Sequence, residues 1–145
     1  MDLRSKKVLV FGAGKSGIGA ADLLGSVGAQ PVIYDGNADL DKEAVLHKTN
    51  GKYQPEIWAG DFPEGELDSL DLVVLSPGVP TDLPLVKKFY EKGLPVWSEV
   101  ELAYRTGKGE VLAITGTNGK TTTTALLGKI MGDARESAFV VGNIG

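Results

Sequence analysis

Residues 7–17 read Lys-Val-Leu-Val-Phe-Gly-Ala-Gly-Lys-Ser-Gly, and they carry the most specific fold signal in the chain. An apolar, β-prone run leads directly into glycines spaced as G-x-G-x-x-G, a turn that joins a strand to a helix in nucleotide-binding proteins. Apolar residues then recur at helical spacing, at Ala20, Leu23, Leu24 and Val27. The stretch therefore predicts a strand, a phosphate-binding turn and a helix, in that order.

A second short apolar run, 31–34, ends at Asp35. In dinucleotide-binding folds an acidic residue at about this distance accepts hydrogen bonds from ribose hydroxyls. Each glycine has a physical reason for its place: Gly12 permits the tight turn, Gly14 lets a diphosphate approach the backbone, and Gly17 lets the helix pack on the strand. Two other interpretations stay open on these residues, a nicotinamide-dependent oxidoreductase and a βαβ unit with an unused loop.

Strands and helices are predicted to alternate as far as residue 109. We expect further strands at 56–59, 70–75 and 94–97, and further helices within 39–50, after a cap at Thr81 or Asp82, and from Ser98 to about Arg105. This alternation predicts an α/β fold with a Rossmann-like parallel sheet. The turn 76–78 follows a predicted strand, at the sheet edge where ligands bind in open α/β folds. The acidic run 61–71 has no metal-ligand spacing, and we interpret it as a solvated connection.

A second glycine turn lies within residues 110–124, which read EVLAITGTNGKTTTT. The run 110–114 predicts a strand, and the apolar residues after the turn predict a helix. The general P-loop pattern, G-x-x-x-x-G-K-[ST], would require glycine at position 114, which is Ile here. Lys120 still follows Gly119 directly, so we expect its ammonium to reach the β/γ-phosphates of a nucleotide and the Thr121 hydroxyl to ligate Mg²⁺.

The composition is that of a globular protein, with 42% hydrophobic and 23% charged residues. The net charge of −4 provides no basic field, so we expect neither nucleic acid nor a membrane as partner. The N-terminal apolar run is too short for a signal peptide, and no stretch approaches a membrane span. We expect a cytoplasmic monomer that acts on small molecules.

We divide the chain into three parts. Residues 1–92 are expected to form the Rossmann-like substrate domain, residues 93–109 a linking strand, helix and boundary, and residues 110–145 the start of a P-loop ATPase-type α/β domain. That last part offers only one further strand, near 138–141, and a two-stranded parallel sheet cannot cover both of its faces. We therefore expect the sequence to be the front part of a longer protein.

The two glycine turns in one chain, with Ser76-Pro-Gly-Val79 between them, resemble the Mur ligase family, and within it the members that add D-glutamate. The resemblance covers the whole chain and is carried by residues 12–17, Asp35, 76–79, 98–103, 115–122 and 142–145. The shortened second turn is similar to the nucleotide loop of that superfamily. Lys15 and Ser16 depart from the first glycine loop of the alanine-adding members.

The resemblance implies an ATP-dependent ligase of peptidoglycan synthesis, which joins D-glutamate to UDP-N-acetylmuramoyl-L-alanine through an acyl phosphate. The implied ATP-binding residues are Gly116, Thr117, Asn118, Gly119, Lys120, Thr121, Thr122 and Thr123, with Lys120 catalytic and Thr121 on Mg²⁺. The implied UDP-binding residues are Gly14, Lys15, Ser16, Gly17, Asp35, Gly36, Asn37, Ser76, Pro77, Gly78 and Asn143.

The family's remaining catalytic parts would lie beyond residue 145. They include an acidic Mg²⁺ ligand and a domain that closes on ATP. We therefore expect the 145-residue chain alone to be inactive. A stand-alone UDP-sugar-binding module is the non-enzymatic alternative.

Overall fold

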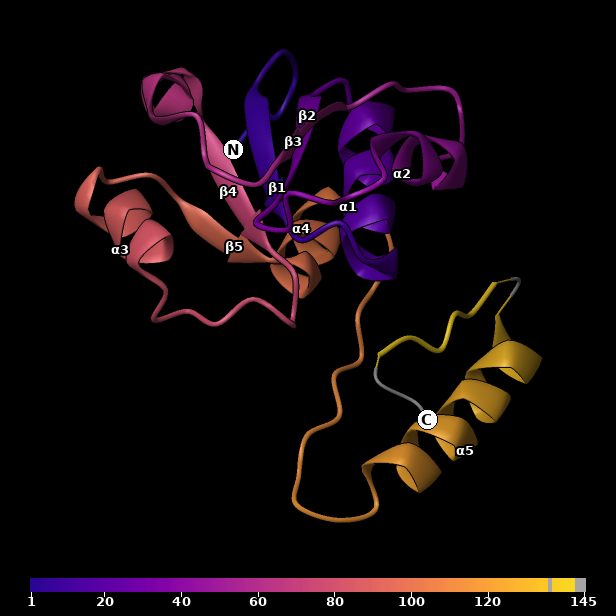
Figure 1. Cartoon of the computed structure of the whole chain (residues 1–145). Helices are drawn as coiled ribbons and strands as arrows, with labels where there is room; N and C mark the ends of the chain where they lie inside the picture. The colour runs from indigo at the N-terminus through magenta and orange to yellow at the C-terminus, as the bar shows by residue number, and fades with distance from the viewer. Residues whose placement is uncertain (136, 143–145) are drawn as a thin grey trace. The chain divides into compact units, whose positions relative to one another are not determined.

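The computed structural model describes residues 1–135 and 137–142, and it contains a first compact unit, Met1–Lys108, and a second that begins at Gly109. The first unit is a parallel five-stranded sheet with helices on both faces (Figure 1). Its strands are β1 (Lys7–Phe11), β2 (Gln30–Asp35), β3 (Glu56–Ala59), β4 (Leu72–Leu75) and β5 (Val96–Ser98). They lie in the order β3-β2-β1-β4-β5, which confirms the predicted Rossmann-like α/β fold.

Successive residues of β1 belong to two separate hydrophobic cores, because successive side chains of a strand point to opposite faces of the sheet. Val8 and Val10 pack with Leu24 of α1 (Lys15–Ser26), Val45 of α2 (Lys42–Lys48) and Leu102 of α4 (Glu99–Thr106). On the other face, Leu9 and Phe11 pack with Val86 and Phe89 of α3 (Pro84–Glu91). The strand is buried on both faces, as expected for a central strand of a parallel sheet.

Local signals explain most helix ends. Asp41 caps α2 by accepting a hydrogen bond from the Ala44 N–H, and Ser98 caps α4 by accepting one from the Glu101 N–H. The predicted cap of α3 at Thr81 or Asp82 is wrong. Its N-cap is Leu83 and the helix starts at Pro84, because proline lacks the N–H that a first helical residue leaves unpaired and its fixed φ suits that position.

The first unit continues past residue 92. Strand β5 pairs with β4, and the Leu102 side chain of α4 is fully buried in the same core as α1. At the two edges of the sheet, Trp58 of β3 lies beneath the Lys7 ammonium, 5.1 Å from the ring centroid, and Trp97 of β5 lies beneath the Arg105 guanidinium at 4.8 Å.

The acidic run 61–71 is more ordered than the solvated connection that we predicted. It contains the 3-10 helix η1 (Glu64–Ser69), and its carboxylates pair with lysines at the start of β1. Lys7 Nζ lies 2.7 Å from Glu66 Oε2, and Lys6 Nζ lies 2.8 Å from Asp71 Oδ1. The Lys7 ammonium lowers the pKa of Glu66, and the Lys6 ammonium lowers the pKa of Asp71.

The second unit contains the helix α5 (Lys120–Ala134). The strands predicted at 110–114 and 138–141 are not formed, and most of their apolar side chains are exposed. A strand needs hydrogen-bonded neighbours, and the described part of this unit supplies no ladder for either segment. Within residues 1–135 and 137–142, no helix is both long enough and apolar enough to span a membrane.

Candidate functional site

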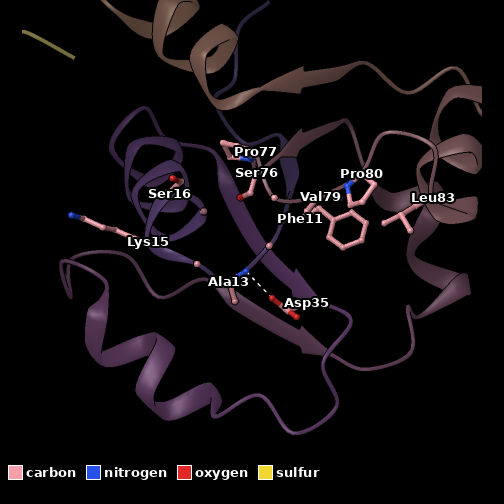
Figure 2. A pocket seen from close by; sticks show the side chains of 14 residues that line it. Phe11, Ala13, Lys15, Ser16, Asp35, Ser76, Pro77, Val79, Pro80 and Leu83 are labelled. Atoms are coloured by element: carbon pink, nitrogen blue, oxygen red, sulfur yellow. Dashed lines mark hydrogen bonds between the residues drawn. The ribbon is translucent and has the colours of Figure 1, made fainter. Parts of the chain in front are cut away.

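A cleft of about 530 Å³ opens at the carboxyl ends of β1 and β4 (Figure 2). Its lining consists of residues 11–17, Asp35, residues 76–80 and Leu83. The chain leaves β1 toward β2 on one side, while β4 lies on the other, so this is the point at which the strand order reverses. Open α/β sheets bind their ligands at such a point.

The turn after β1 has the geometry that its glycines predict. Gly12 has a φ of +113°, and its N–H donates to the Tyr34 carbonyl at 2.7 Å. A Cβ at position 17 would lie 1.9 Å from the Gly12 carbonyl oxygen, whereas a Cβ at position 14 would have no neighbour within 4 Å. Gly17 is therefore required for packing, and Gly14 leaves open space beside the backbone.

Helix α1 begins at Lys15 with Gly14 as its N-cap, so its first turn faces the cleft. The first N–H groups of a helix have no intrahelical carbonyl to bond, and they form the positive end of the helix dipole. Ser16 lines the cleft, while the Lys15 side chain extends away from Ser76 (Figure 2). In this orientation the Lys15 ammonium does not point toward Ser76, and the backbone N–H groups of the first helical turn are the candidate donors to an anion.

Asp35 braces the glycine turn. Its Oδ2 accepts a hydrogen bond from the Ala13 N–H at 3.0 Å (Figure 2), and its Oδ1 accepts one from the Asn37 N–H at 3.0 Å. An ionised carboxylate can accept about four hydrogen bonds, so Asp35 keeps acceptor capacity for a ligand. Gly36 and Asn37 follow it in the chain but do not line the cleft.

The end of β2 that carries Asp35 is fixed by Gly60. The Gly60 N–H donates to the Asp35 carbonyl at 2.9 Å, and the Tyr34 hydroxyl donates to the Gly60 carbonyl at 3.0 Å. Burial raises the pKa of Tyr34, with smaller contributions from the carboxylates of Asp61 and Asp35. The phenol therefore stays protonated and remains a donor at neutral pH.

The opposite wall is the turn that contains Ser76, Pro77 and Gly78. The Val79 N–H closes this turn on the Ser76 carbonyl at 2.9 Å. The Ser76 hydroxyl donates to Glu99 Oε1 at 2.8 Å. We did not predict a role for Glu99 from the sequence, although it directly follows the helix cap at Ser98.

The second glycine turn lies in the second unit, before α5. Gly116 and Gly119 both have positive φ, +148° and +76°, and Gly119 is the N-cap of the helix. Lys120 Nζ donates to the carbonyl oxygens of Gly116, at 2.6 Å, and Thr117, at 3.3 Å. Residues 116–123 are all exposed. A left-handed glycine, a helix N-terminus and a lysine ammonium together fit a polyphosphate.

The described residues provide only part of a Mg²⁺ site. Thr121 is exposed in the first turn of α5, where its hydroxyl can serve as one oxygen ligand. The described part of the chain contains no group of three or more His, Cys, Asp or Glu side chains that could hold a metal ion. Mg²⁺ at such a site takes most of its other ligands from phosphates and water. Asn143, the last predicted site residue, lies outside the described residues.

Comparison with known proteins agrees with this geometry. The family model described as "Mur ligase MurD-like, N-terminal domain" matches residues 6–98. The chain belongs to the MurD-like Mur ligases. This membership confirms the resemblance on which the sequence interpretation depends.

Relatives of the MurD-like chain share its whole length. It is 56% identical to UDP-N-acetylmuramoylalanine--D-glutamate ligase of Lachnospira eligens and 52% identical to that of Lachnoclostridium phytofermentans, each over 145 residues. In both cases the match covers 100% of this chain and 32% of the relative. The chain thus spans about a third of the length of these curated relatives.

Among solved structures, shikimate dehydrogenase from Aquifex aeolicus is 16% identical, with a TM-score of 0.47 over 72% of this chain and 46% of that one. A likeness this distant says nothing about activity.

Proposed function

We propose that this chain supplies the UDP-binding cleft and the beginning of the ATP-binding region of an ATP-dependent ligase. The ligase would join D-glutamate to UDP-N-acetylmuramoyl-L-alanine. The observation that carries the proposal is the cleft between the turns after β1 and β4, in a chain of the MurD-like family. In this proposal residues 1–92 hold the UDP-linked substrate, residues 93–109 contain β5 and α4 of the first unit and lead into the second, and residues 110–145 begin the ATP-binding domain.

The diphosphate of the substrate would lie against the glycine turn. The open space beside Gly14 lets two phosphates approach the backbone, and the first turn of α1 offers N–H groups at Lys15 and Ser16. These donors are fixed by the fold, so they need no reorganisation when an anion binds. Gly17 would act indirectly, because it lets α1 start close to the Gly12 carbonyl.

The uridine would lie toward Asp35. Its carboxylate already holds the Ala13 and Asn37 N–H groups, and its free lone pairs can accept from a ribose hydroxyl or a uracil N–H. Pro77 and Gly78 would line the opposite wall. We extend the proposal to Gly36, Asn37 and Asn143 as further contacts of the uridine and the sugar diphosphate.

The chemistry belongs to the complete enzyme. The γ-phosphoryl group of ATP would be transferred to the substrate carboxylate, with ADP leaving. The amine of D-glutamate would then attack the acyl carbon, with phosphate leaving. Phosphoryl transfer depends chiefly on positioning and on neutralising charge, which is what the chain's own residues offer.

Lys120 would exchange its bonds to the Gly116 and Thr117 carbonyls for phosphate oxygens. The Thr121 hydroxyl would ligate Mg²⁺, whose charge offsets that of the phosphates when it is bound. Thr117, Asn118, Thr122 and Thr123 would shape the loop around them. We also propose that the protein is a cytoplasmic monomer, and that the 145-residue chain alone forms no product.

Calorimetric titration of the 145-residue chain tests the substrate assignment. UDP and UDP-N-acetylmuramoyl-L-alanine should bind, and NAD⁺ should not. Gly14→Ala should lower UDP affinity by about tenfold, because the added methyl fills the space for the diphosphate. Gly19→Ala is the matched control, since Gly19 lies in the helix that Gly14 caps and also has open space around it. Tight NAD⁺ binding without a UDP response would overturn the proposal.

A further inference from the structure

We propose that Glu99 is a positioning residue for the cleft. Through Ser76 it holds the turn after β4 at a fixed distance from the glycine turn after β1. The part of this inference that concerns ligand affinity rests on the proposed binding of UDP. Glu99 itself does not line the cleft, so its effect has to pass through another side chain.

The hydrogen bond between the two residues joins neighbouring strand ends. Ser76 directly follows β4, and Glu99 is the first residue of α4, directly after β5. Ser76 Oγ donates to Glu99 Oε1 at 2.8 Å, Ser76 is buried, and Glu99 is half-buried. Hydrogen bonds to an ionised acceptor are stronger than neutral ones, and partial burial protects this one from water.

Ser76 in turn packs against both ends of the glycine turn. A Cβ at position 12 would lie 2.9 Å from Ser76 Cβ, and a Cβ at position 17 would lie 3.1 Å from Ser76 Oγ. The serine side chain therefore occupies the space that these two glycines leave free. A rotation of Ser76 would change the packing at Gly12 and Gly17, and with it the start of α1.

The direction of the hydrogen bond limits what Ser76 can do for a ligand. A hydroxyl has one proton, and the Ser76 proton is given to Glu99. The hydroxyl then cannot donate to a diphosphate, so its contribution is spacing rather than anion binding. The backbone N–H groups of the glycine turn remain as the donors.

A role of Glu99 through its charge and a role through its position predict different effects of substitution on UDP binding. A carboxylate near a diphosphate repels it, so a role through charge alone means that removing the charge strengthens UDP binding. A positioning role means that binding depends on the reach of the side chain, with or without its charge. Glu99→Asp shortens the reach and keeps the charge, while Glu99→Gln keeps the reach and an oxygen acceptor but removes the charge.

Glu101 provides a matched control on the same helix. Its Oε1 accepts from the Arg105 Nε at 2.6 Å in an exposed pair, and it does not line the cleft. Glu101→Asp is therefore the same chemical change in the first turn of α4, at a side chain that bonds to Arg105 instead of Ser76. Aspartate is tolerated in the first turn of a helix, so both variants should fold.

The experiment measures UDP affinity by calorimetry and amide hydrogen exchange without ligand. Glu99→Asp should lower UDP affinity by about tenfold and raise exchange in residues 12–17 and 76–79, because Ser76 loses its partner. Glu99→Gln should stay within about threefold of the parent chain, and Glu101→Asp should match it in both measurements. In a Ser76→Ala background, Glu99→Asp should have no further effect.

Unchanged exchange and unchanged affinity in Glu99→Asp would overturn the inference, as would stronger UDP binding by Glu99→Gln. If the parent chain binds no UDP, the proposed function fails. The exchange of residues 12–17 and 76–79 then still decides the role of Glu99, because that comparison uses no ligand.

Discussion

The glycine turn after β1 and the glycine turn before α5 each place a helix N-terminus behind glycines, but their neighbours differ. The first turn is held by the Tyr34 carbonyl, by Asp35 and by Ser76, which come from the ends of β2 and β4, the two strands that flank β1. In the second turn, Lys120 bonds to the Gly116 and Thr117 carbonyls, both within the turn itself.

This difference shows that glycine spacing encodes the path of a turn, while the surrounding sheet determines how firmly the turn is held. The conformations at Gly12 and Gly119 are both local, since positive φ costs glycine little. The bonds that brace the first turn, from Gly12 to Tyr34 and from Ala13 to Asp35, join residues more than twenty positions apart. Such bonds exist only after the strands have assembled.

The largest expected effect comes from shortening one leucine on the helix behind each turn. Leu24 of α1 is fully buried, and Leu24→Ala should lower the free energy of unfolding by about 3 kcal/mol. Leu126 of α5 is 60% exposed, and Leu126→Ala should change it by less than about 0.5 kcal/mol. Urea denaturation followed by far-UV circular dichroism measures both. Equal losses would contradict the contrast between the two helices.

The next largest effect separates packing from ligand binding within the first turn. Gly17→Ala forces a methyl against the Gly12 carbonyl and should cost about 2 kcal/mol or more of stability. Gly14→Ala meets no neighbour and should cost about 0.5 to 1 kcal/mol, because alanine is a poorer N-cap than glycine, while weakening UDP binding. Thermal unfolding with and without UDP distinguishes the two variants, and a Gly17→Ala chain as stable as the parent would refute the steric role.

A smaller effect tests whether the two turns serve different ligands. Asp35→Ala leaves the Ala13 N–H without its partner and removes an acceptor from the cleft, so UDP affinity should fall by about 1 to 2 kcal/mol. Lys120→Ala should leave UDP affinity unchanged and abolish any binding of ATP, because its ammonium lies in the other turn. Loss of UDP binding in Lys120→Ala would argue against separate sites.

The smallest expected effect is on how the stability of the fold depends on pH. The hydrogen bond from Lys6 lowers the pKa of Asp71 below its ordinary value of 3.8. The ionised carboxylate therefore stabilises the fold at pH values above about 4. The stabilisation should be lost as the pH falls below about 4 and the carboxylate is protonated. Asp71→Asn should give a shallower decline of the urea midpoint between about pH 4 and 2. An identical decline in both chains would exclude Asp71 as a cause.

Much of the first unit could be predicted from the sequence, because its signals are local. The strands at 7–11 and 56–59 were predicted with their observed bounds, and Ser98 caps α4 as its spacing indicates. The predicted fifth strand, 94–97, starts two residues before β5 (Val96–Ser98), because Leu94 is apolar and packs against the core but lies outside the strand.

The errors and omissions arise where structure depends on distant partners. The segments 110–114 and 138–141 have strand-like sequences but no ladder among the described residues, so propensity alone misleads there. The sequence grouped 12–17, Asp35 and 76–78 at one sheet edge, and the structure brings them together in one cleft. The bond between Ser76 and Glu99 depends on the pairing of β4 with β5, which no local pattern specifies.

The tryptophan fluorescence of this chain reports on the first unit alone. The chain contains two tryptophans, Trp58 and Trp97, and they lie in β3 and β5, the opposite edges of the same sheet. Residues 109–145 contain none. Tryptophan fluorescence therefore does not report on α5, whereas far-UV circular dichroism reports on the helices of both units. Recording both signals through one melt would show, without any label or substitution, whether the two units lose their structure together or one after the other.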